Sequence, residues 1–233
     1  MKGIFDITRW KALLSVSDNY ISGFTMTLKV ALAGLLLALV LGVFFGMLST
    51  GKSKILKLIA RIYVEFFQNT PLVIQVFFYY NCLPYIIGGR VPKFTLGVIG
   101  VGIYHGAYIS EVIRTGIEAI PKGQFEAAFS QGFSYMQTMR YIILPQTIKL
   151  IMPPLANQAL NLVKNTSVLA MVAGLDLMYH ADSWASDRGF FVQAYIACAL
   201  LYFIICFPLA MLARWLETRA KRTPVPKKRK EAA

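Results

Sequence analysis

Long stretches with few or no charged residues constrain the fold of this chain more than any other feature of its sequence. Residues 190–212 carry no charge, and residues 21–48 carry only Lys29. At about 1.5 Å per residue, a helix of this length crosses a hydrocarbon core of about 30 Å. Of all residues, 57% are hydrophobic and only 15% are charged, whereas soluble domains have about 25% charged residues. The sequence therefore predicts an all-α polytopic membrane protein.

The apolar segments predict five spanning helices and three parts of the chain. An amphipathic segment at residues 1–20 suits a helix in the membrane interface. The membrane domain is expected at residues 21–217, followed by a basic tail at residues 218–233. Small residues allow helices to pack closely, and glycines of this kind lie in the first and third spans: Gly42, Gly46, Gly97, Gly100, Gly102 and Gly106. The predicted spans are residues 21–48, 62–87, 94–117, a stretch that begins around Thr147, and residues 190–212.

The positions of the basic residues predict the orientation in the membrane. With five spans and the N-terminus outside, sixteen Lys and Arg residues fall in inside segments and six in outside segments. Cytoplasmic segments of membrane proteins carry an excess of Lys and Arg. The segment between the third and fourth spans is therefore expected in the cytoplasm, with the C-terminus. The net charge of +13 then reflects membrane orientation rather than nucleic-acid binding.

A short polar island at residues 126–145 lies between long apolar runs, and it predicts two short helices. Pro121 suits the first turn of a helix, and Gly132 suits the left-handed conformation that ends one. A second helix is expected from Tyr135 to Leu144, and Pro145 follows it. An interfacial or re-entrant amphipathic hairpin without a partner is the alternative interpretation.

This island resembles the cytoplasmic EAA loop of the permease subunits of ATP-binding-cassette (ABC) importers, in which two small helices fit a cleft on the ATPase. The resemblance implies a type I permease fold with a coupling loop at about residues 118–145. It also implies that Glu126 is the charged contact to the ATPase and that Gly132 sets the bend. The matching residues are Glu126, Ala127, Ala128, Gly132, Ile142, Leu144 and Pro145, and the predicted coupling surface comprises Gln124, Glu126, Ala127, Ala128, Phe129 and Gly132.

Three further stretches resemble permeases of the polar amino acid subgroup: VEFFQNTPLVIQVFF, ISEVIRTGIEAIPKGQFEAA and the run from Lys164 to Ser167. Gln68 departs from the arginine that commonly precedes the Asn/Gly-Thr-Pro motif. Pro71 is expected to free a backbone carbonyl toward a cavity, or only to kink the helix. Glu111 and Arg114 stand three residues apart on one helical face and are expected to pair.

Lys164 is the most informative single residue outside the polar island. A cation at mid-membrane costs about 2.5–3.5 kcal/mol unless it faces water or a partner. The resemblance implies a substrate path lined by Lys164, Asn165, Thr166 and Ser167, together with Thr70 and Pro71. Alternatively, Lys164 only pairs with Glu65 or Glu111.

The resemblance implies a permease subunit of an ATP-driven, binding-protein-dependent importer of polar amino acids in the bacterial inner membrane. Acidic or neutral polar substrates such as glutamate, aspartate or glutamine are favoured over basic ones, because no acidic residue is obviously placed for a cationic side chain. The expected partners are ABC ATPase subunits that bind ATP and Mg²⁺, a second permease, an external binding protein, the substrate and membrane lipid. An ATP-independent secondary transporter or channel is the alternative.

Catalytic chemistry has no support in the sequence. The pattern GMLSTGKS matches a phosphate-binding loop, but that loop works between a strand and a helix, not after a membrane span. His105 and His180 are far apart and share no ligand motif, so no metal site is expected. The three cysteines lie in apolar stretches and are predicted to be free thiols. We therefore expect no cofactor in this chain and no enzymatic activity.

Overall fold

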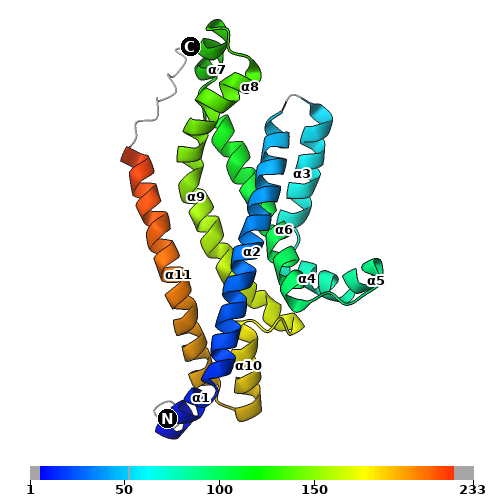
Figure 1. Cartoon of the computed structure of the whole chain (residues 1–233), viewed down its shortest axis with the longest axis vertical. Helices are drawn as coiled ribbons and strands as arrows, with labels where there is room; N and C mark the ends of the chain where they lie inside the picture. The colour runs from blue at the N-terminus through cyan, green and yellow to red at the C-terminus, as the bar shows by residue number, and fades with distance from the viewer. Residues whose placement is uncertain (1–5, 52, 223–233) are drawn as a thin grey trace.

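The computed structural model describes residues 6–51 and 53–222, and within them it consists of helices and their connections, as predicted (Figure 1). The helices are α1 (Ile7–Leu14), α2 (Ser17–Thr50), α3 (Lys54–Gln68), α4 (Leu72–Asn81), α5 (Leu83–Ile87), α6 (Lys93–Glu118), α7 (Lys122–Ser130), α8 (Tyr135–Thr138), the π-helical turn η1 (Met139–Ile143), α9 (Leu144–Asn165), the 3₁₀ helix η2 (Thr166–Val172), α10 (Leu177–Arg188) and α11 (Phe191–Arg222).

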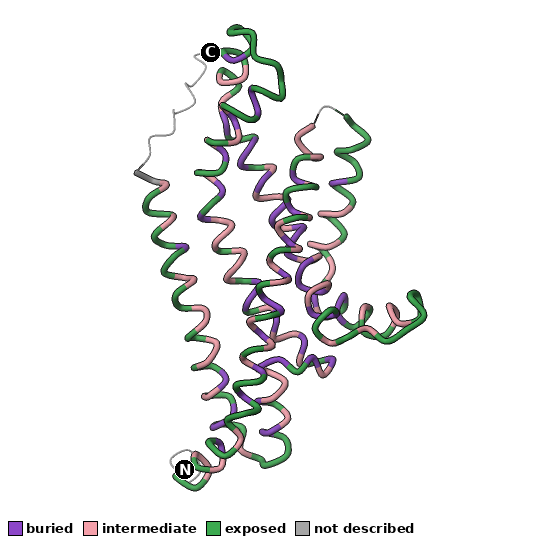
Figure 2. The backbone as a smooth tube through the Cα atoms, viewed as in Figure 1, coloured by how far each residue is buried: buried purple, intermediate pink, exposed green. Residues whose placement is uncertain are grey.

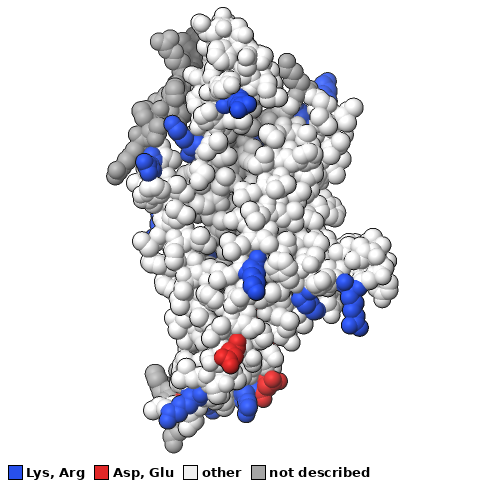
Figure 3. Space-filling view, viewed as in Figure 1, with Lys and Arg blue, Asp and Glu red and all other residues white. Residues whose placement is uncertain are grey.

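Three of the described helices, α2, α6 and α11, are long and apolar enough to cross a membrane. The pair α3 and α4 makes a fourth candidate if the two are counted as one bent span. The four long helices α2, α6, α9 and α11 run along the long axis of the molecule (Figure 1). On the face drawn in Figure 3, a band without charged side chains separates basic residues near the α7–α8 end from charged residues nearer the other end.

The chain reverses at two opposite ends of the molecule. The turn between α2 and α3 lies toward the same end as α7 and α8, and α11 runs toward that end. Helices α1 and α10 lie at the other end (Figure 1). Segments that the positive-inside rule assigns to one side of the membrane are thus found together.

Helix α6 is the central helix of the bundle. In its most apolar stretch 61% of the residues are buried, against 11% in α11, and Figure 2 shows α11 exposed along most of its length. Helix α2 packs against α6 through its glycines. A Cβ atom on Gly42 would lie 2.3 Å from Cγ2 of Ile109, and one on Gly46 would lie 2.8 Å from Cβ of Ile113.

The contact is reciprocal, because glycines of α6 face large residues of α2. A Cβ atom on Gly102 would lie 2.7 Å from Cδ2 of Leu37, and one on Gly106 would lie 3.0 Å from Cβ of Leu41. Real Cβ atoms do not approach other atoms at under 3 Å, so only glycine fits at the tightest of these positions. The predicted role of the glycines in close helix packing is confirmed.

The second predicted span, residues 62–87, was wrong as a single helix. Helix α3 begins at Lys54 and ends at Gln68, and its axis makes an angle of 96° with that of the following helices. The break falls at Thr70 and Pro71, because proline lacks an N–H and disfavours helical geometry in the residue before it. Residues 54–61, which precede the predicted span, form the first turns of α3.

The polar island forms two helices around a left-handed glycine, as predicted. Gly132 has φ of +81°, and Ser134 caps α8 through a reciprocal capping box with Gln137. The predicted helix end at Pro145 was wrong. The helix continues through η1 into α9, and Pro145 stands in the first turn of α9, where the hydrogen-bonding register changes and its missing N–H costs little.

The C-terminal part of the chain contains more helix than the predicted spans. Residues 174–189, which precede the predicted fifth span, contain the twelve-residue helix α10. Helix α11 continues ten residues beyond Leu212 to Arg222, so the predicted tail begins as a helix, and residues 223–233 lie outside the described residues. At the N-terminus, α1 occupies part of the predicted interfacial segment, whose first five residues are likewise outside the description.

Asp176 fixes the position of α10. It is fully buried, and its Oδ2 accepts a hydrogen bond from the Met178 N–H at 3.1 Å at the start of the helix. The next residue, Leu177, donates its N–H to Oγ1 of Thr27 on α2 at 3.1 Å. Burial raises the pKa of the Asp176 carboxyl from 3.8 to about 6. The carboxyl of Asp176 therefore ionises at a higher pH in the fold than in the unfolded chain.

Replacing Gly42 with valine should lower the unfolding temperature of the purified protein, because the added side chain collides with Ile109 on α6. Overpacking of this kind costs about 1–3 kcal/mol. Thermal unfolding in detergent measures the change. The matched control is Gly89→Val, since nothing lies within 4 Å of that position. Equal unfolding temperatures for the two variants would contradict the close contact.

The stability of the protein should fall as the pH rises through about 6, because the raised pKa of Asp176 makes its charged form unfavourable in the fold. Relative to the charged form, the neutral carboxyl stabilises the fold fully below pH 3.8, the pKa in the unfolded chain, and this stabilisation is lost above about pH 6. Asp176→Asn stays neutral, so it should unfold at a higher temperature than the wild type at pH 8, with a smaller difference near pH 5. Asp187→Asn on the exposed end of α10 is the control. An identical pH dependence in the Asp176→Asn variant would refute this account.

Candidate functional site

The first candidate site is the surface of α7 in the predicted coupling loop. Glu126, Ala127 and Phe129 are exposed, and Phe129 leaves 47% of its surface accessible although it is aromatic. Ala128 is buried at 2% exposure and faces the interior of the chain. The helical period of 3.6 residues explains this difference between adjacent residues. The outward surface of α7 therefore presents one acidic side chain beside a small and an aromatic apolar side chain.

Two features connect this surface to the long helices. Gln146 on α9 donates its amide N–H to Oε1 of Gln124 at 3.2 Å and to the carbonyl of Ile142 at 2.8 Å. Helix α8 also passes into α9 through η1 without a loop. Gln124, which sequence analysis placed on the coupling surface, thus lies half-buried and holds α7 against α9. A displacement of α7 would be passed directly to α9.

The predicted path residues at the end of α9 point in different directions. The exposed Lys164 and the half-buried Ser167 line a groove of about 520 Å³ between α9, α10 and α11. Thr166 is fully buried and donates to the carbonyl of Val163 at 2.8 Å. Asn165 lies 3.0 Å from Nε2 of His105 on α6. The groove thus receives only two of the four residues.

His105 joins α6 to α9 in the interior, a role that sequence analysis missed. It is 2% exposed, and its Nδ1 lies 3.3 Å from Oε1 of Gln158. When Asn165 donates to Nε2, the proton on Nδ1 is free to donate to Gln158. The sequence offers little sign of this role. A single histidine in an apolar span does not indicate its hydrogen-bond partners, because these lie on another helix whose position is not known from the sequence.

The other two predicted path residues, Thr70 and Pro71, form the bend between α3 and α4. Pro71 does not leave a carbonyl free to face a cavity, contrary to one of the two expectations. The buried Gln75 donates its amide to the carbonyls of Phe67 and Thr70, both at 3.0 Å. Helix α4 packs beside η2. The bend and the segment after Lys164 therefore belong to neighbouring elements.

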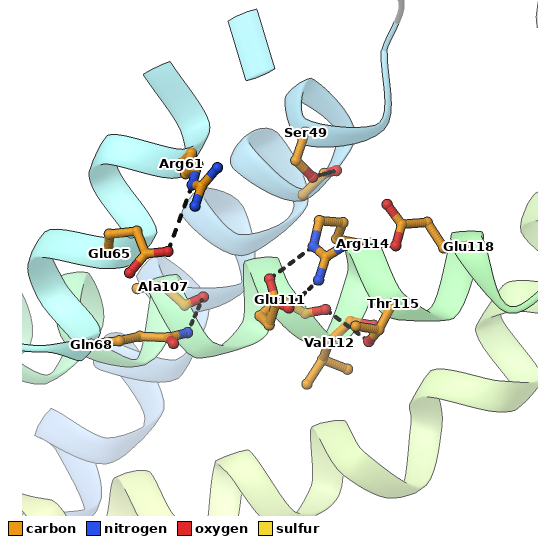
Figure 4. Close-up of polar contacts among 11 residues, drawn as sticks. Ser49, Arg61, Glu65, Gln68, Ala107, Glu111, Val112, Arg114, Thr115 and Glu118 are labelled. Atoms are coloured by element: carbon orange, nitrogen blue, oxygen red, sulfur yellow. Dashed lines mark hydrogen bonds and ion pairs between the residues drawn. The ribbon is translucent and has the colours of Figure 1, made fainter. Parts of the chain in front are cut away.

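A polar cavity of about 540 Å³ lies between α2, α3 and α6, and it is the second candidate site (Figure 4). Arg114 donates to Glu111 through Nε at 2.9 Å and through Nη2, and to Glu118 through Nη1 at 2.6 Å. The predicted pair of Glu111 and Arg114 is therefore confirmed. Opposite them on α3, Arg61 lies 3.7 Å from Glu65, and Gln68 donates to the carbonyl of Ala107 at 3.2 Å.

These contacts contradict the alternative interpretation of Lys164. Glu65 pairs with Arg61 and bonds Asn69, while Glu111 pairs with Arg114. Lys164 instead lines the groove beside α11, on a different side of α9. It therefore does not serve as the counter-ion of either glutamate.

Known proteins are similar to this chain in sequence and in fold. Residues 34–222 match the family described as "Binding-protein-dependent transport system inner membrane component". The chain is 44% identical over 204 residues to the "Probable glutamine ABC transporter permease protein GlnM" of Bacillus subtilis (strain 168), covering 88% of this chain and 94% of that protein. It is 34% identical over 200 residues to the "Probable glutamine ABC transporter permease protein GlnP" of the same organism, covering 84% and 91%.

Among solved structures, the chain resembles one described as "Crystal structure of an amino acid ABC transporter with histidines". The TM-score is 0.81 at 33% sequence identity, and the match covers 89% of this chain and 97% of that one. The likeness thus extends over most of the chain.

Gln75→Leu should destabilise the bend, because it leaves the carbonyls of Phe67 and Thr70 without their donor in a buried setting. Unsatisfied buried polar groups cost about 1–3 kcal/mol each. Thermal unfolding of the purified protein measures the loss. Asn81→Leu is a suitable control, since Asn81 is exposed at the end of the same helix and bonds only within it. Unfolding temperatures that match for both variants would argue against this role of Gln75.

Proposed function

This chain belongs to the family of binding-protein-dependent transport system inner membrane components, as a non-catalytic permease subunit of an ABC transporter of amino acids, and we propose that it imports glutamine. The support for the substrate is that two similar permeases are named for glutamine. Glutamine also belongs to the neutral polar amino acids that the sequence favoured over basic ones.

The proposed topology has five membrane crossings, with the N-terminus outside and the C-terminus in the cytoplasm. The crossings are α2, the bent pair α3 and α4, α6, α9 and α11. Two observations support this arrangement. The α2–α3 turn and the α7–α8 segment lie toward one end of the molecule (Figure 1), and basic residues are concentrated in the segments assigned to that side.

The proposed assembly contains two permeases, two ATPase subunits that bind ATP and Mg²⁺, and an external binding protein. Membership of a binding-protein-dependent transport family implies the ATPase and the binding protein. The second permease, identical or not, is our expectation from the resemblance. The lipid-facing surface is then formed by exposed apolar residues, of which α11 carries many.

The single observation that carries the proposed mechanism is the rigid connection of the coupling loop to α9. Glu126, with the exposed Ala127 and Phe129, would contact the ATPase, while Gly132 sets the angle between α7 and α8. The bond between Gln124 and Gln146 and the continuous helix through η1 then carry a movement of α7 into α9. Such rigid-body movements open transporters to one side and then to the other.

The proposed substrate path includes Lys164 and Ser167, which line the groove beside α11, and the bend at Thr70 and Pro71. In this proposal Asn165 and Thr166 do not line the path, but hold the residues that line it in place. Asn165 connects to His105, and Thr166 is fully buried. The exposed ammonium group of Lys164 would lie in water rather than lipid, which removes most of its cost.

ATP-dependent uptake of labelled glutamine into proteoliposomes containing this chain, its co-purifying ATPase and its binding protein tests the proposal. We expect uptake of glutamine, less of glutamate and little of arginine. Uptake that proceeds without ATP would instead identify a secondary transporter or channel.

Glu126→Lys should reduce ATP-driven uptake at least tenfold and weaken co-purification of the ATPase, because it reverses the one acidic charge of the proposed contact. Asp187→Lys, a charge reversal at the end of α10, should retain co-purification. Wild-type uptake by the Glu126→Lys variant would remove the role proposed for Glu126.

A further inference from the structure

The cavity between α2, α3 and α6 is lined by equal numbers of acidic and basic side chains. Its cations are Lys57, Arg61 and Arg114, and its anions are Glu65, Glu111 and Glu118. Glu65 stands eleven residues after the start of α3, which corresponds to about 16 Å along the helix. In the proposed topology, the charges thus extend from the α2–α3 turn toward the interior of the membrane.

The charged groups of α3 face the cavity without being enclosed by protein. The side chains of Arg61 and Glu65 are 78% and 59% exposed. Charged side chains inside a membrane protein face water or one another rather than lipid, because lipid exposure is too costly. Both side chains line the cavity and are open to it, so a polar solute that enters can reach them.

The two ion-pair systems of the cavity differ in how many hydrogen-bond donors and acceptors they leave for a ligand. Arg114 uses three of its nitrogen atoms to bind Glu111 and Glu118, so its donors are largely occupied (Figure 4). Arg61 and Glu65 meet at 3.7 Å, beyond hydrogen-bond distance, and no planar two-point contact forms between them. Arg61 therefore keeps N–H donors for a ligand, and Glu65, which accepts one hydrogen bond from Asn69 at 3.0 Å, keeps its Oε1 as an acceptor.

Beyond the charges, the cavity ends in uncharged polar groups. Gln68 lies one turn further along α3 than Glu65 and shares the cavity wall with the buried Ser110 of α6. Gln68 donates one N–H to the carbonyl of Ala107. An amide has two donors and an acceptor, so Gln68 retains the capacity to bond a second amide.

We infer that this cavity binds a zwitterionic amino acid with an uncharged polar side chain. Arg61 receives the α-carboxylate, Glu65 receives the α-ammonium group, and Gln68 bonds the side-chain amide. The balanced charge of the lining favours a zwitterion over a net cation or anion. This inference rests on the proposed function and names a binding site within it, apart from the groove at Lys164.

The test is equilibrium binding of labelled L-glutamine to the purified permease–ATPase complex in nanodiscs, without binding protein or ATP. N-acetyl-L-glutamine lacks the ammonium group and L-glutamine α-amide lacks the carboxylate. Both should compete at least about tenfold more weakly than glutamine, as expected for the loss of a charged contact.

Variants then separate ligand binding from a structural role of the ion pair. Arg61→Gln should bind glutamine and its α-amide with equal affinity, and Glu65→Gln should bind glutamine and its N-acetyl derivative with equal affinity. A purely structural pair would change all affinities by the same factor, which overturns the inference. Gln68→Glu should gain affinity for lysine, and this gain shows that the variant is folded. The control Asp187→Asn should bind as the wild type does.

The outcome for the cavity is distinguishable from the outcome for the proposed function. If the wild-type complex imports glutamine with ATP but shows no direct binding up to about 10 mM, the cavity inference fails and the function stands. If the complex imports no amino acid, the proposed function fails. Preserved discrimination among the three ligands in both charge variants also overturns the cavity inference.

Discussion

The close contact between α2 and α6 is the constraint on which the rest of the structure depends. Gly42 and Gly46 of α2 face Ile109 and Ile113 of α6, and glycines of α6 face leucines of α2 in return. Helix association inside a membrane gains little from the hydrophobic effect, because lipid is as apolar as the helices. Shape complementarity must supply the energy instead. With α6 held in the centre, α3, α9 and α4 all pack against or beside it, and both the coupling loop and the polar cavity start from its C-terminal half.

The sequence predicted the long elements and the two short helices α7 and α8 well, because both depend on local patterns. Long apolar segments with few charges predicted α2, α6 and α11, and Gly132 predicted the break between α7 and α8. The sequence-based prediction failed at two prolines, where nearby residues change the effect that a proline usually has on a helix. Pro145 looked like a helix end, but the π-helical turn before it changes the bonding register and lets the helix continue. Pro71 was expected either to free a carbonyl or only to kink the helix, and the amide of Gln75 binds the carbonyls of the bend.

The candidate site was harder to predict than the fold for the same reason. A run such as Lys164 to Ser167 reads as one unit in sequence, yet its side chains point into a groove, toward His105 and into the core. Only part of the polar cavity could be predicted from the sequence. Glu111 and Arg114 share a helix and a spacing that predicts their pairing. Their position opposite Arg61 and Glu65 of α3 depends on how α3 packs against α6, and no local pattern contains that information.

The geometry also suggests how the coupling loop and the cavity communicate. Glu118 is the last residue of α6, and only three residues separate it from the start of α7. Glu118 is also one of the two carboxylates that hold Arg114 at the cavity wall. A rotation of α7 therefore acts first on the residue that completes the pairing of Arg114. Withdrawal of Glu118 would free the Nη1 donor toward the cavity and change its charge balance. If α7 contacts the ATPase and the cavity binds an amino acid, as proposed above, a movement of α7 would thus alter the affinity of the cavity for that ligand, which is what coupled transport requires of a binding site.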